Sequence, residues 1–346
     1  RTIFAYSIVG LVAITVFGIS VWKTLSPIPS APQMTSRFIV NATESLSIFG
    51  FKHSVAISPD GTRFVYVVKK GNNTQLRLRS INEFSATPIP GSDGAEGPFF
   101  SPNGDWVGFF ASGVLKKVSL MGGAPTILCQ APNPRGGSWT RDDSIFFAPS
   151  TNTGLSEVAA EGGIPQALTS LDTENGERTH RWPDILPNTD WILVTTLSRA
   201  IDSYDDAQIE VLSLETRERR LVIDGGTFAR YSPTGHLVYA RRSAILAAPF
   251  DISTLDVTAP PVTLVEGVSM DPASGNAQFA MSSNGTLVYV LGKASTEQRT
   301  LLWVDRDGRS VTLSNVPRAF RHPRLSGDGQ RIAVTVEAAQ ADLWIY

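Results

Sequence analysis

Histidine, arginine and tryptophan side chains close to recurring turns are the residues of this chain that could take part in chemistry. Three of the four histidines, His53, His180 and His322, lie shortly before such a turn, and the fourth is His236. If the loops bring these imidazole, guanidinium and indole groups together on one face, they would form a basic, aromatic mouth. Such a mouth suits an anionic peptide or a carboxylate. The predicted binding residues of this mouth are Arg135, Arg178, His180, Arg181, Trp182, Arg318, Arg321 and His322. The alternative is a solvated rim of unrelated loop residues.

No pattern in the sequence specifies catalysis or a bound metal. Asp305-Arg306-Asp307-Gly308 resembles the start of a calcium loop, but the glutamate that such a loop needs further on is absent, which favours a plain turn. The acidic residues Asp202, Asp205 and Asp206 fit a solvated loop. A Gly-x-Ser-x-Gly nucleophile elbow does not occur. We therefore predict no catalytic residue, no metal and no cofactor.

A repeat must position these side chains, because a short turn signature recurs along the chain. Its full form is Ser-Pro-Asp-Gly, in which proline presets φ, Asp or Asn caps its own turn, and glycine accepts a positive φ. The copies follow one another at a mean spacing of about 45 residues, which is typical of four-stranded propeller blades. The turn residues are Asp60, Gly61, Asn103, Gly104, Asp142, Asn188, Gly235, Asn284, Gly285, Asp328 and Gly329.

Each turn lies between two apolar segments. A large apolar residue precedes every turn, as Phe100 and Trp139 do, and we expect it in the core. A β-branched or aromatic run such as Phe64-Val65-Tyr66-Val67 follows, and then two further short strands. The pattern predicts an all-β fold, a β-propeller with six four-stranded blades from about Val55 to Pro317 and a seventh unit that starts near Arg321 and stops in its third strand.

The closure of the wheel stays open at this point. Residues 37–40 could supply a closing strand, or the seventh unit could belong to a larger or second wheel. We assign residues 37–346 to the propeller repeats.

The N-terminal segment predicts a membrane anchor. Residues 3–22 are largely apolar and long enough for an α-helix to cross a bilayer, so residues 1–25 are assigned as a transmembrane anchor. A cleavable signal peptide is the alternative, although its apolar region is usually shorter. Arg1 and Lys23 flank the segment and barely bias its orientation. Residues 26–36, rich in proline and serine, form a linker.

Composition excludes some partners. The chain has 30 Lys and Arg against 32 Asp and Glu, without a long basic run, so we expect no nucleic acid. The single cysteine, Cys129, excludes an internal disulfide and sites built on cysteine pairs. The chain starts at Arg1 rather than Met and ends at Tyr346 within an expected strand, so we expect a piece of a longer protein.

The turns and apolar strands resemble the repeats of TolB-like periplasmic propellers, a WD-type wheel. Longer stretches resemble the extracytoplasmic region of bacterial membrane-anchored serine/threonine protein kinases: residues 136–142, residues 145–149, His180-Arg181-Trp182-Pro183, and Pro249-Phe250-Asp251 followed by Leu255. In that family a cytoplasmic kinase domain precedes one transmembrane helix and a propeller of this type. No Gly-rich phosphate loop, His-Arg-Asp or Asp-Phe-Gly occurs here, so the kinase domain itself is absent from these residues.

Three functions follow as hypotheses. The first is a non-catalytic propeller, held in the periplasm by an inner-membrane anchor of a receptor-like kinase, that binds an unknown protein, peptide or small ligand. The second is the propeller of a serine peptidase whose α/β-hydrolase domain lies downstream. The third is a TolB-like envelope scaffold with no enzyme attached. Propeller faces bind through loops, so no linear motif identifies the ligand.

Overall fold

The computed structural model describes residues 39, 46, 52–198, 201, 203–292, 300–314, 316, 318, 320–336 and 342–346. The predicted anchor at residues 1–25 and the linker at residues 26–36 lie outside the described residues, and so does the possible closing strand at 37–40 except Ile39. Within the described ranges, no helix has both the length and the apolar character needed to cross a membrane.

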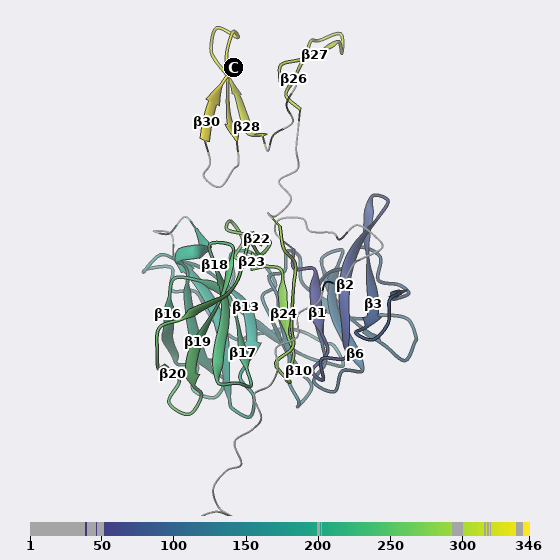
Figure 1. Ribbon diagram of the computed structural model, residues 1–346, viewed down its shortest axis with the longest axis vertical. Helices are drawn as coiled ribbons and strands as arrows, with labels where there is room; N and C mark the ends of the chain where they lie inside the picture. The colour runs from purple at the N-terminus through teal and green to yellow at the C-terminus, as the bar shows by residue number, and fades with distance from the viewer. Residues whose placement is uncertain are drawn as a thin grey trace, which may run out of the picture. The chain divides into compact units, whose positions relative to one another are not determined.

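Five consecutive antiparallel sheets form most of the described chain, and each begins with a strand that precedes a recurring turn (Figure 1). Blade 1 contains β1 (Val55–Ile57), β2 (Arg63–Lys70), β3 (Asn73–Ser80) and β4 (Thr87–Pro88). Blade 2 contains β5 (Glu96–Phe100), β6 (Trp106–Ala111), β7 (Val114–Ser119) and β8 (Thr126–Gln130). Blade 3 contains β9 (Gly137–Trp139), β10 (Ser144–Phe147), β11 (Ser156–Ala159) and β12 (Gln166–Ala167).

The next two sheets follow the same order. Blade 4 contains β13 (Glu177–Ile185), β14 (Trp191–Ser198), β15 (Gln208–Ser213) and β16 (Arg219–Asp224), with the short 3₁₀ helix η1 (Tyr204–Asp206) before β15. Blade 5 contains β17 (Thr227–Ser232), β18 (His236–Arg241) and β19 (Ala244–Asp251), and both β20 (Asp256–Val257) and β21 (Val262–Glu266) pair with β19.

The turns after the first strands have the chemistry that their sequence predicts. The Ser58 hydroxyl donates to the Asp60 carboxylate at 2.5 Å, and the same carboxylate accepts the backbone N–H of Thr62. Asn103 and Asn284 cap their turns in the same way. Positive φ angles occur at Gly61, Gly104, Gly235, Gly285 and Gly329 and, where glycine is missing, at Asp143 and Asn188. A local hydrogen-bond pattern therefore sets each hairpin.

The second strand of a blade is buried on both faces because neighbouring blades pack against it. Phe64 to Val68 of β2 are all buried, as are Ile192 to Leu197 of β14. Alternate side chains of such a strand enter different clusters: Phe146 packs with Ile192 of blade 4, whereas Phe147 packs with Phe110 of blade 2. This explains the continuous apolar runs in the sequence.

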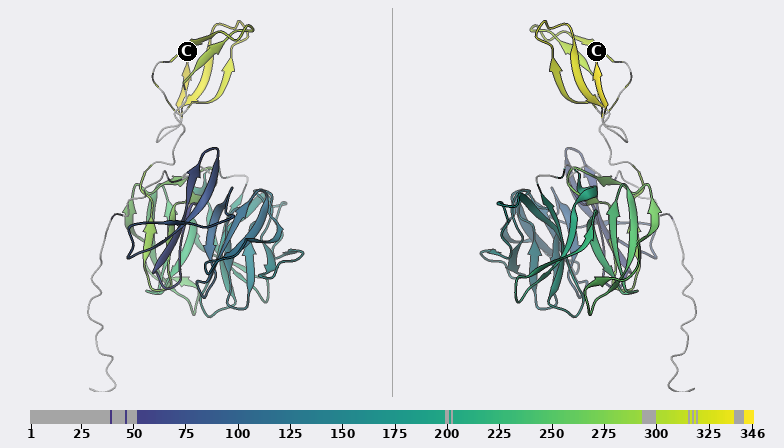
Figure 2. Two further views of the ribbon diagram at one scale, coloured as in Figure 1. Left: turned by 90° about the vertical axis from the view of Figure 1, so that its right-hand side faces the viewer. Right: turned by 90° about the vertical axis from the view of Figure 1, so that its left-hand side faces the viewer.

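The first strands form a closed ring. Each contacts the next, from β1 through β5, β9, β13 and β17 to β24 (Phe279–Met281), and β24 in turn contacts β1 (Figures 1 and 2). Gln278, which precedes β24, accepts the N–H of Ser54 at 2.9 Å and donates to the carbonyl of Lys52 at 2.8 Å. Contacts between residues more than 220 positions apart therefore close the wheel.

The sixth unit differs from the prediction of a complete four-stranded blade. Its β24 pairs with β25 (Leu287–Tyr289), after a small hairpin of β22 (Met270–Asp271) and β23 (Asn276–Ala277). The predicted third strand, residues 301–305, contains β26 (Leu302–Val304), but among the described residues β26 pairs only with β27 (Ser310–Thr312). The Asp305 carboxylate accepts the N–H groups of Asp307 and Arg309 and closes this hairpin on itself.

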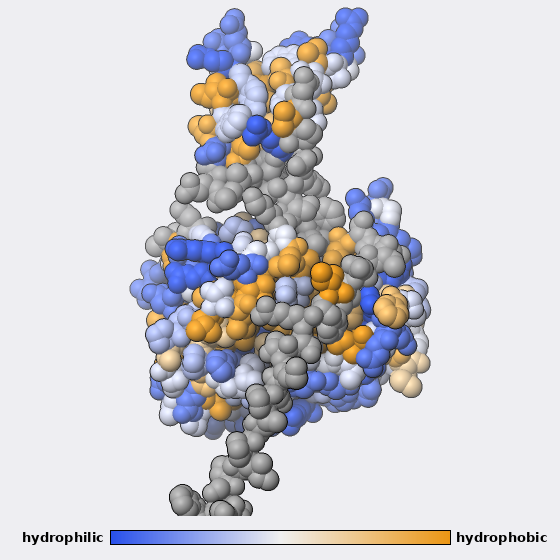
Figure 3. Space-filling model, viewed as in Figure 1, coloured by the Kyte–Doolittle hydropathy of each residue, from blue (hydrophilic) through white to orange (hydrophobic). Residues whose placement is uncertain are grey.

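Apolar side chains remain exposed in this region. They gather over the part of the wheel where β24 lies (Figure 3), and Leu291, just after β25, is 60% exposed. The seventh unit forms a separate sheet of three strands, β28 (Phe320–Leu325), β29 (Ile332–Val336) and β30 (Asp342–Ile345).

Candidate functional site

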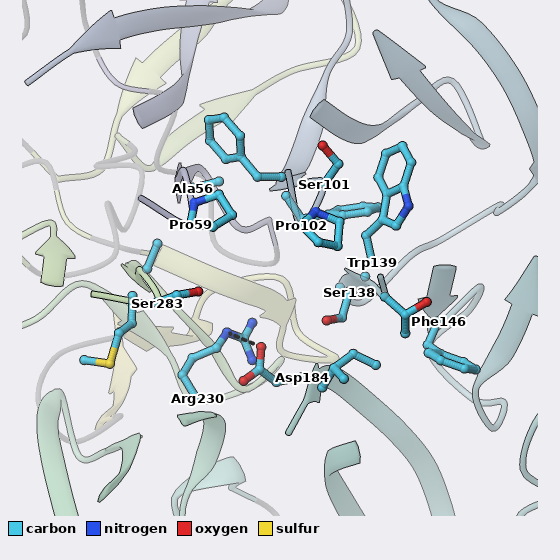
Figure 4. A pocket seen from close by; sticks show the side chains of 18 of the residues that line it. Ala56, Pro59, Ser101, Pro102, Ser138, Trp139, Phe146, Asp184, Arg230 and Ser283 are labelled. Carbon is cyan, nitrogen blue, oxygen red and sulfur yellow. Dashed lines mark ion pairs between the residues drawn. The ribbon is translucent and has the colours of Figure 1, made fainter. Parts of the chain in front are cut away.

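A cavity of about 580 Å³ lies on the axis of the ring, lined by residues from all six first strands and by the turns that follow them (Figure 4). Its volume is within the range of roughly 300 to 1,000 Å³ that is usual for ligand sites. We call this cavity the axial funnel. Because Pro59, Pro102 and Asn188 of the turns are among its lining residues, the funnel opens on the face that carries the recurring turns.

Apolar side chains form part of the wall of the funnel. The wall includes the residue directly before the turn in five units: Ile57, Phe100, Trp139, Ile185 and Met281. The sequence places these side chains in the core, whereas Phe100, Ile185 and Met281 are only partly buried and face the cavity. Leu325 of the seventh unit is 53% exposed. The same repeat position thus supplies a binding surface as well as packing.

An aromatic plug closes the bottom of the funnel. Phe228 is fully buried, with ring centroids 5.1 Å from Trp182, 5.2 Å from Phe279 and 4.7 Å from His53. Trp182 and Phe228 both have positive φ angles, of 56° and 58°. They stand four residues before the turn in their units, where Gly97 and Gly136 have the same backbone conformation. Two bulky residues in an unusual conformation therefore block the axis.

Arg230 and Asp184 lie side by side in the funnel (Figure 4), and because Arg230 stacks on Phe228 of the plug, we call this part of the cavity its floor. The Arg230 Nε is 3.7 Å from Asp184 Oδ1, and the guanidinium carbon stacks 4.1 Å from the centroid of Phe228. Asp184 Oδ2 accepts the N–H of Tyr231 at 3.2 Å. Burial raises the pKa of Asp184, and the nearby Arg230 charge offsets part of this effect.

His53 belongs to the plug and is only 8% exposed. Its Nδ1 lies 3.1 Å from the carbonyl oxygen of Ala277. Burial, and then the positive charge of Arg230, lower the pKa of His53 to about 3. This imidazole is therefore neutral at physiological pH and contributes no positive charge to a mouth.

Arg135 and Arg181, two residues of the predicted mouth, are not among the residues that line the funnel, although each directly precedes a residue with positive φ, Gly136 and Trp182. Both are buried. The Arg181 guanidinium donates to the carbonyls of Thr151 and Ser274 and stacks 4.7 Å from Tyr204, and burial lowers its pKa to about 10. Arg181 therefore links blades 3 and 4 to the loop before β24.

Another part of the predicted mouth is internal to blade 4. His180 is fully buried, with Nδ1 2.7 Å from the Thr169 hydroxyl and Nε2 3.1 Å from Glu177. Burial would raise the pKa of Glu177, but hydrogen bonds from His180, Arg219 and the Asp172 N–H outweigh it and lower that pKa to about 2. Arg178 is exposed next to this network.

The remaining predicted residues belong to the seventh unit. Arg318 stacks 4.4 Å from the ring of Trp344, and Arg321 pairs through its backbone with Thr335 of β29. His322 has a φ of 48° and an exposed side chain. The partners of Arg318 and Arg321, Trp344 and Thr335, both belong to the seventh unit, whereas Arg135, Arg178, His180, Arg181 and Trp182 belong to blades 3 and 4.

The described residues contain no group of three or more His, Cys, Asp or Glu that could hold a metal ion. Cys129 is buried in the cluster between blades 2 and 3, and burial raises the pKa of its thiol to about 11, so the reactive thiolate is disfavoured. What the site offers is a cavity with apolar and polar side chains in its wall and a charged pair at its floor.

Sequence reasoning misses Arg230 and Asp184, although the repeat contains a signal for them. Both stand two residues before the first residue of their turns, a position held elsewhere in the ring by Ala56, Phe99, Ser138 and Ala280. Blades 4 and 5 are neighbours, so a negative and a positive residue at one repeat position must lie side by side. Aligning the units by this position, rather than by the turn alone, would identify the pair.

Comparisons with known proteins bear on the fold. No protein-family model and no curated protein matches the sequence. TolB from Agrobacterium tumefaciens superimposes with a TM-score of 0.50 at 16% identity, over 70% of this chain and 91% of that one. TolB from Acinetobacter baumannii gives 0.48 at 17% identity, over 57% of this chain and about half, 51%, of that one. An oligogalacturonate lyase from Vibrio parahaemolyticus gives 0.45 at 10% identity, covering 86% and 89%. The likeness to the Agrobacterium protein shows the fold alone: a TolB-like β-propeller.

Proposed function

We propose that this chain is a non-catalytic recognition propeller that binds part of a protein or peptide in the axial funnel. The observation that carries the proposal is the funnel itself, formed by all six first strands, open on the turn face and closed by the Phe228 plug. Apolar side chains next to the Arg230 and Asp184 pair favour binding with orientation. A closed floor favours a ligand that enters and leaves by the same face.

The proposed setting is the periplasmic part of a membrane-anchored serine/threonine kinase. The resemblance of residues 136–142 and 180–183 to that family supports it, together with the apolar segment at residues 3–22. The propeller of a serine peptidase and a TolB-like envelope scaffold are the other two settings compatible with this fold. An in-frame kinase domain upstream of Arg1 in the coding DNA would support the kinase setting, and a downstream nucleophile elbow would support the peptidase.

Blocking the funnel tests the recognition function. The Ser138 side chain lines the cavity, so the larger indole of Ser138→Trp should fill part of it. We expect wild type to retain members of an immobilised tetrapeptide library and Ser138→Trp to bind them at least about tenfold more weakly, because the added indole excludes the ligand. Ser170→Trp, at an exposed loop position outside the funnel, is the matched control. Equal binding by Ser138→Trp and Ser170→Trp, or no binding by wild type, would contradict the proposal.

A further inference from the structure

Arg230 presents hydrogen-bond donors to the funnel that the described protein does not use. Its Nη1 donates to the carbonyl of Ala229 at 2.8 Å and approaches that of Trp182 at 3.4 Å. Neither Nε nor Nη2 makes a hydrogen bond with a described residue, since the 3.7 Å between Nε and Asp184 is too long for one. The side chain is 15% exposed and lines the cavity. A fixed guanidinium with open donors at the end of a cavity is a polar subsite.

Asp184 supplies the matching acceptor. Its side chain is 23% exposed and also lines the cavity, and its Oδ1 makes no hydrogen bond with a described residue. Donor and acceptor therefore stand next to each other at the floor with opposite charges. Arg230 would attract a ligand carboxylate, but repulsion from Asp184 would cancel much of that attraction. An ammonium group would be attracted by Asp184 and repelled by Arg230, so it would gain as little.

A neutral group with one acceptor and one donor satisfies both residues. The plug prevents a peptide ligand from passing along the axis of the ring. The neutral group must therefore reach the floor at the end of a ligand side chain, while the ligand backbone stays nearer the rim. We propose that the floor of the funnel recognises a primary carboxamide, as in an Asn or Gln side chain, whose oxygen accepts from Arg230 and whose NH₂ donates to Asp184. The methylene groups of that side chain pack against Phe100, Trp139 and Met281. This proposal rests on the function proposed above.

The charges around the floor are few. Among the lining residues, Arg141, Asp142 and Asp190 belong to the turns at the rim, and Asp142 and Asp190 are exposed, where solvent screens them. His53 beneath the floor is neutral. Binding of a neutral amide therefore depends mainly on Arg230 and Asp184.

Three forms of one library-derived tetrapeptide test this, with Gln, Glu or Leu at a single position. In mildly alkaline buffer, which favours the ionised form of Asp184, calorimetry on wild type should show the Gln peptide binding roughly tenfold to a hundredfold more tightly than the Glu peptide, and more tightly than the Leu peptide. Asp184→Asn should reverse the order of Gln and Glu, because the Arg230 charge is then uncompensated. Asp256→Asn, in the exposed pair of Arg220 and Asp256, should leave the order unchanged.

The outcomes separate the two proposals. If the three peptides bind equally and Ser138→Trp blocks all of them, the funnel is a binding site but the carboxamide proposal is wrong. If the Glu peptide binds wild type more tightly than the Gln peptide, the floor is an anion site and the proposal is again wrong. If no peptide binds wild type, the recognition function fails first. Should Asp184→Asn fail to fold, Arg230→Gln must weaken the Gln peptide selectively, and equal weakening of the Leu peptide would overturn the proposal.

Discussion

His53 is a buried imidazole that the fold keeps neutral. Its pKa falls from 6.5 to about 3, so between these pH values the unfolded chain binds a proton that the folded protein does not. Stability should therefore decrease as the pH falls through this window, by up to a few kcal/mol near its lower end. His53→Gln, which cannot be protonated, should flatten the dependence in urea unfolding measured at a series of pH values.

The control for this effect is the half-buried His236 of blade 5, whose ring hydrogen-bonds Thr234. His236→Gln should leave the slope of stability against pH unchanged. Glu177 adds its own acid sensitivity, since its pKa is lowered from 4.5 to about 2 and its stabilising effect disappears as the pH falls between these values. That contribution is common to wild type and both variants, so it cancels in the comparison. Identical slopes for all three proteins would show that His53 is not the group that titrates.

At the scale of the strand, the chain next to the plug requires residues that can adopt a positive φ. Gly136 has a φ of 90°, and a Cβ there would lie 2.8 Å from Trp182 Cε3 and 3.1 Å from its Cα. Gly136→Ala should therefore cost about 3 kcal/mol, from backbone strain and from displacement of the plug. Gly285 has a φ of 88°, and a Cβ there would meet nothing within 4 Å, so Gly285→Ala should cost only about 1 kcal/mol.

Chemical denaturation gives both values. A Gly136→Ala protein as stable as Gly285→Ala would mean that the plug moves aside at no cost, which is incompatible with the tight contacts of Trp182 and Phe228.

Strand-level structure is the part of this fold that the sequence predicts well, because its causes are local. The Ser58 and Asp60 hydrogen bond and the positive φ of Gly61 are properties of four adjacent residues, and the double burial of β2 is visible as an apolar run. The plug is not visible in this way. Trp182 and Phe228 take a conformation that local preference assigns to glycine, and only tertiary packing holds them in it.

The candidate site shows the same difference between local features, which the sequence predicts, and tertiary features, which it does not. The clustering of arginine and histidine near turns predicts a mouth, but burial takes His180 into blade 4 and Arg181 into a link between blades. The funnel floor depends on Arg230 and Asp184 being ring neighbours, which is a property of repeat alignment rather than of sequence distance. Residue type identifies groups able to bind, whereas position within the repeat decides which of them face a cavity.

At the scale of the whole molecule, the ring is closed through contacts between its first and last units. Gln278 is 1% exposed, and its side chain makes two hydrogen bonds with the segment before β1. Gln278→Leu removes both bonds from a buried site, so it should lower the free energy of unfolding by about 2 to 3 kcal/mol. Because the bonds join the two ends of the ring, we also expect faster amide hydrogen exchange in β1 and β24 together.

Gln166 of the outer strand β12 provides the matched control, since it is exposed and its side chain approaches only the nearby carbonyl of Ile164. Gln166→Leu should change stability by less than about 0.5 kcal/mol and leave exchange in β1 and β24 unaltered. If Gln278→Leu behaves like Gln166→Leu, these side-chain bonds do not close the ring, and the other contacts between the sixth unit and blade 1, such as those of His53 with Ala277 and of Asn284 with Asp60, must do so instead. Exchange that rises in β24 but not in β1 would mean that the sixth unit opens alone while blade 1 stays folded.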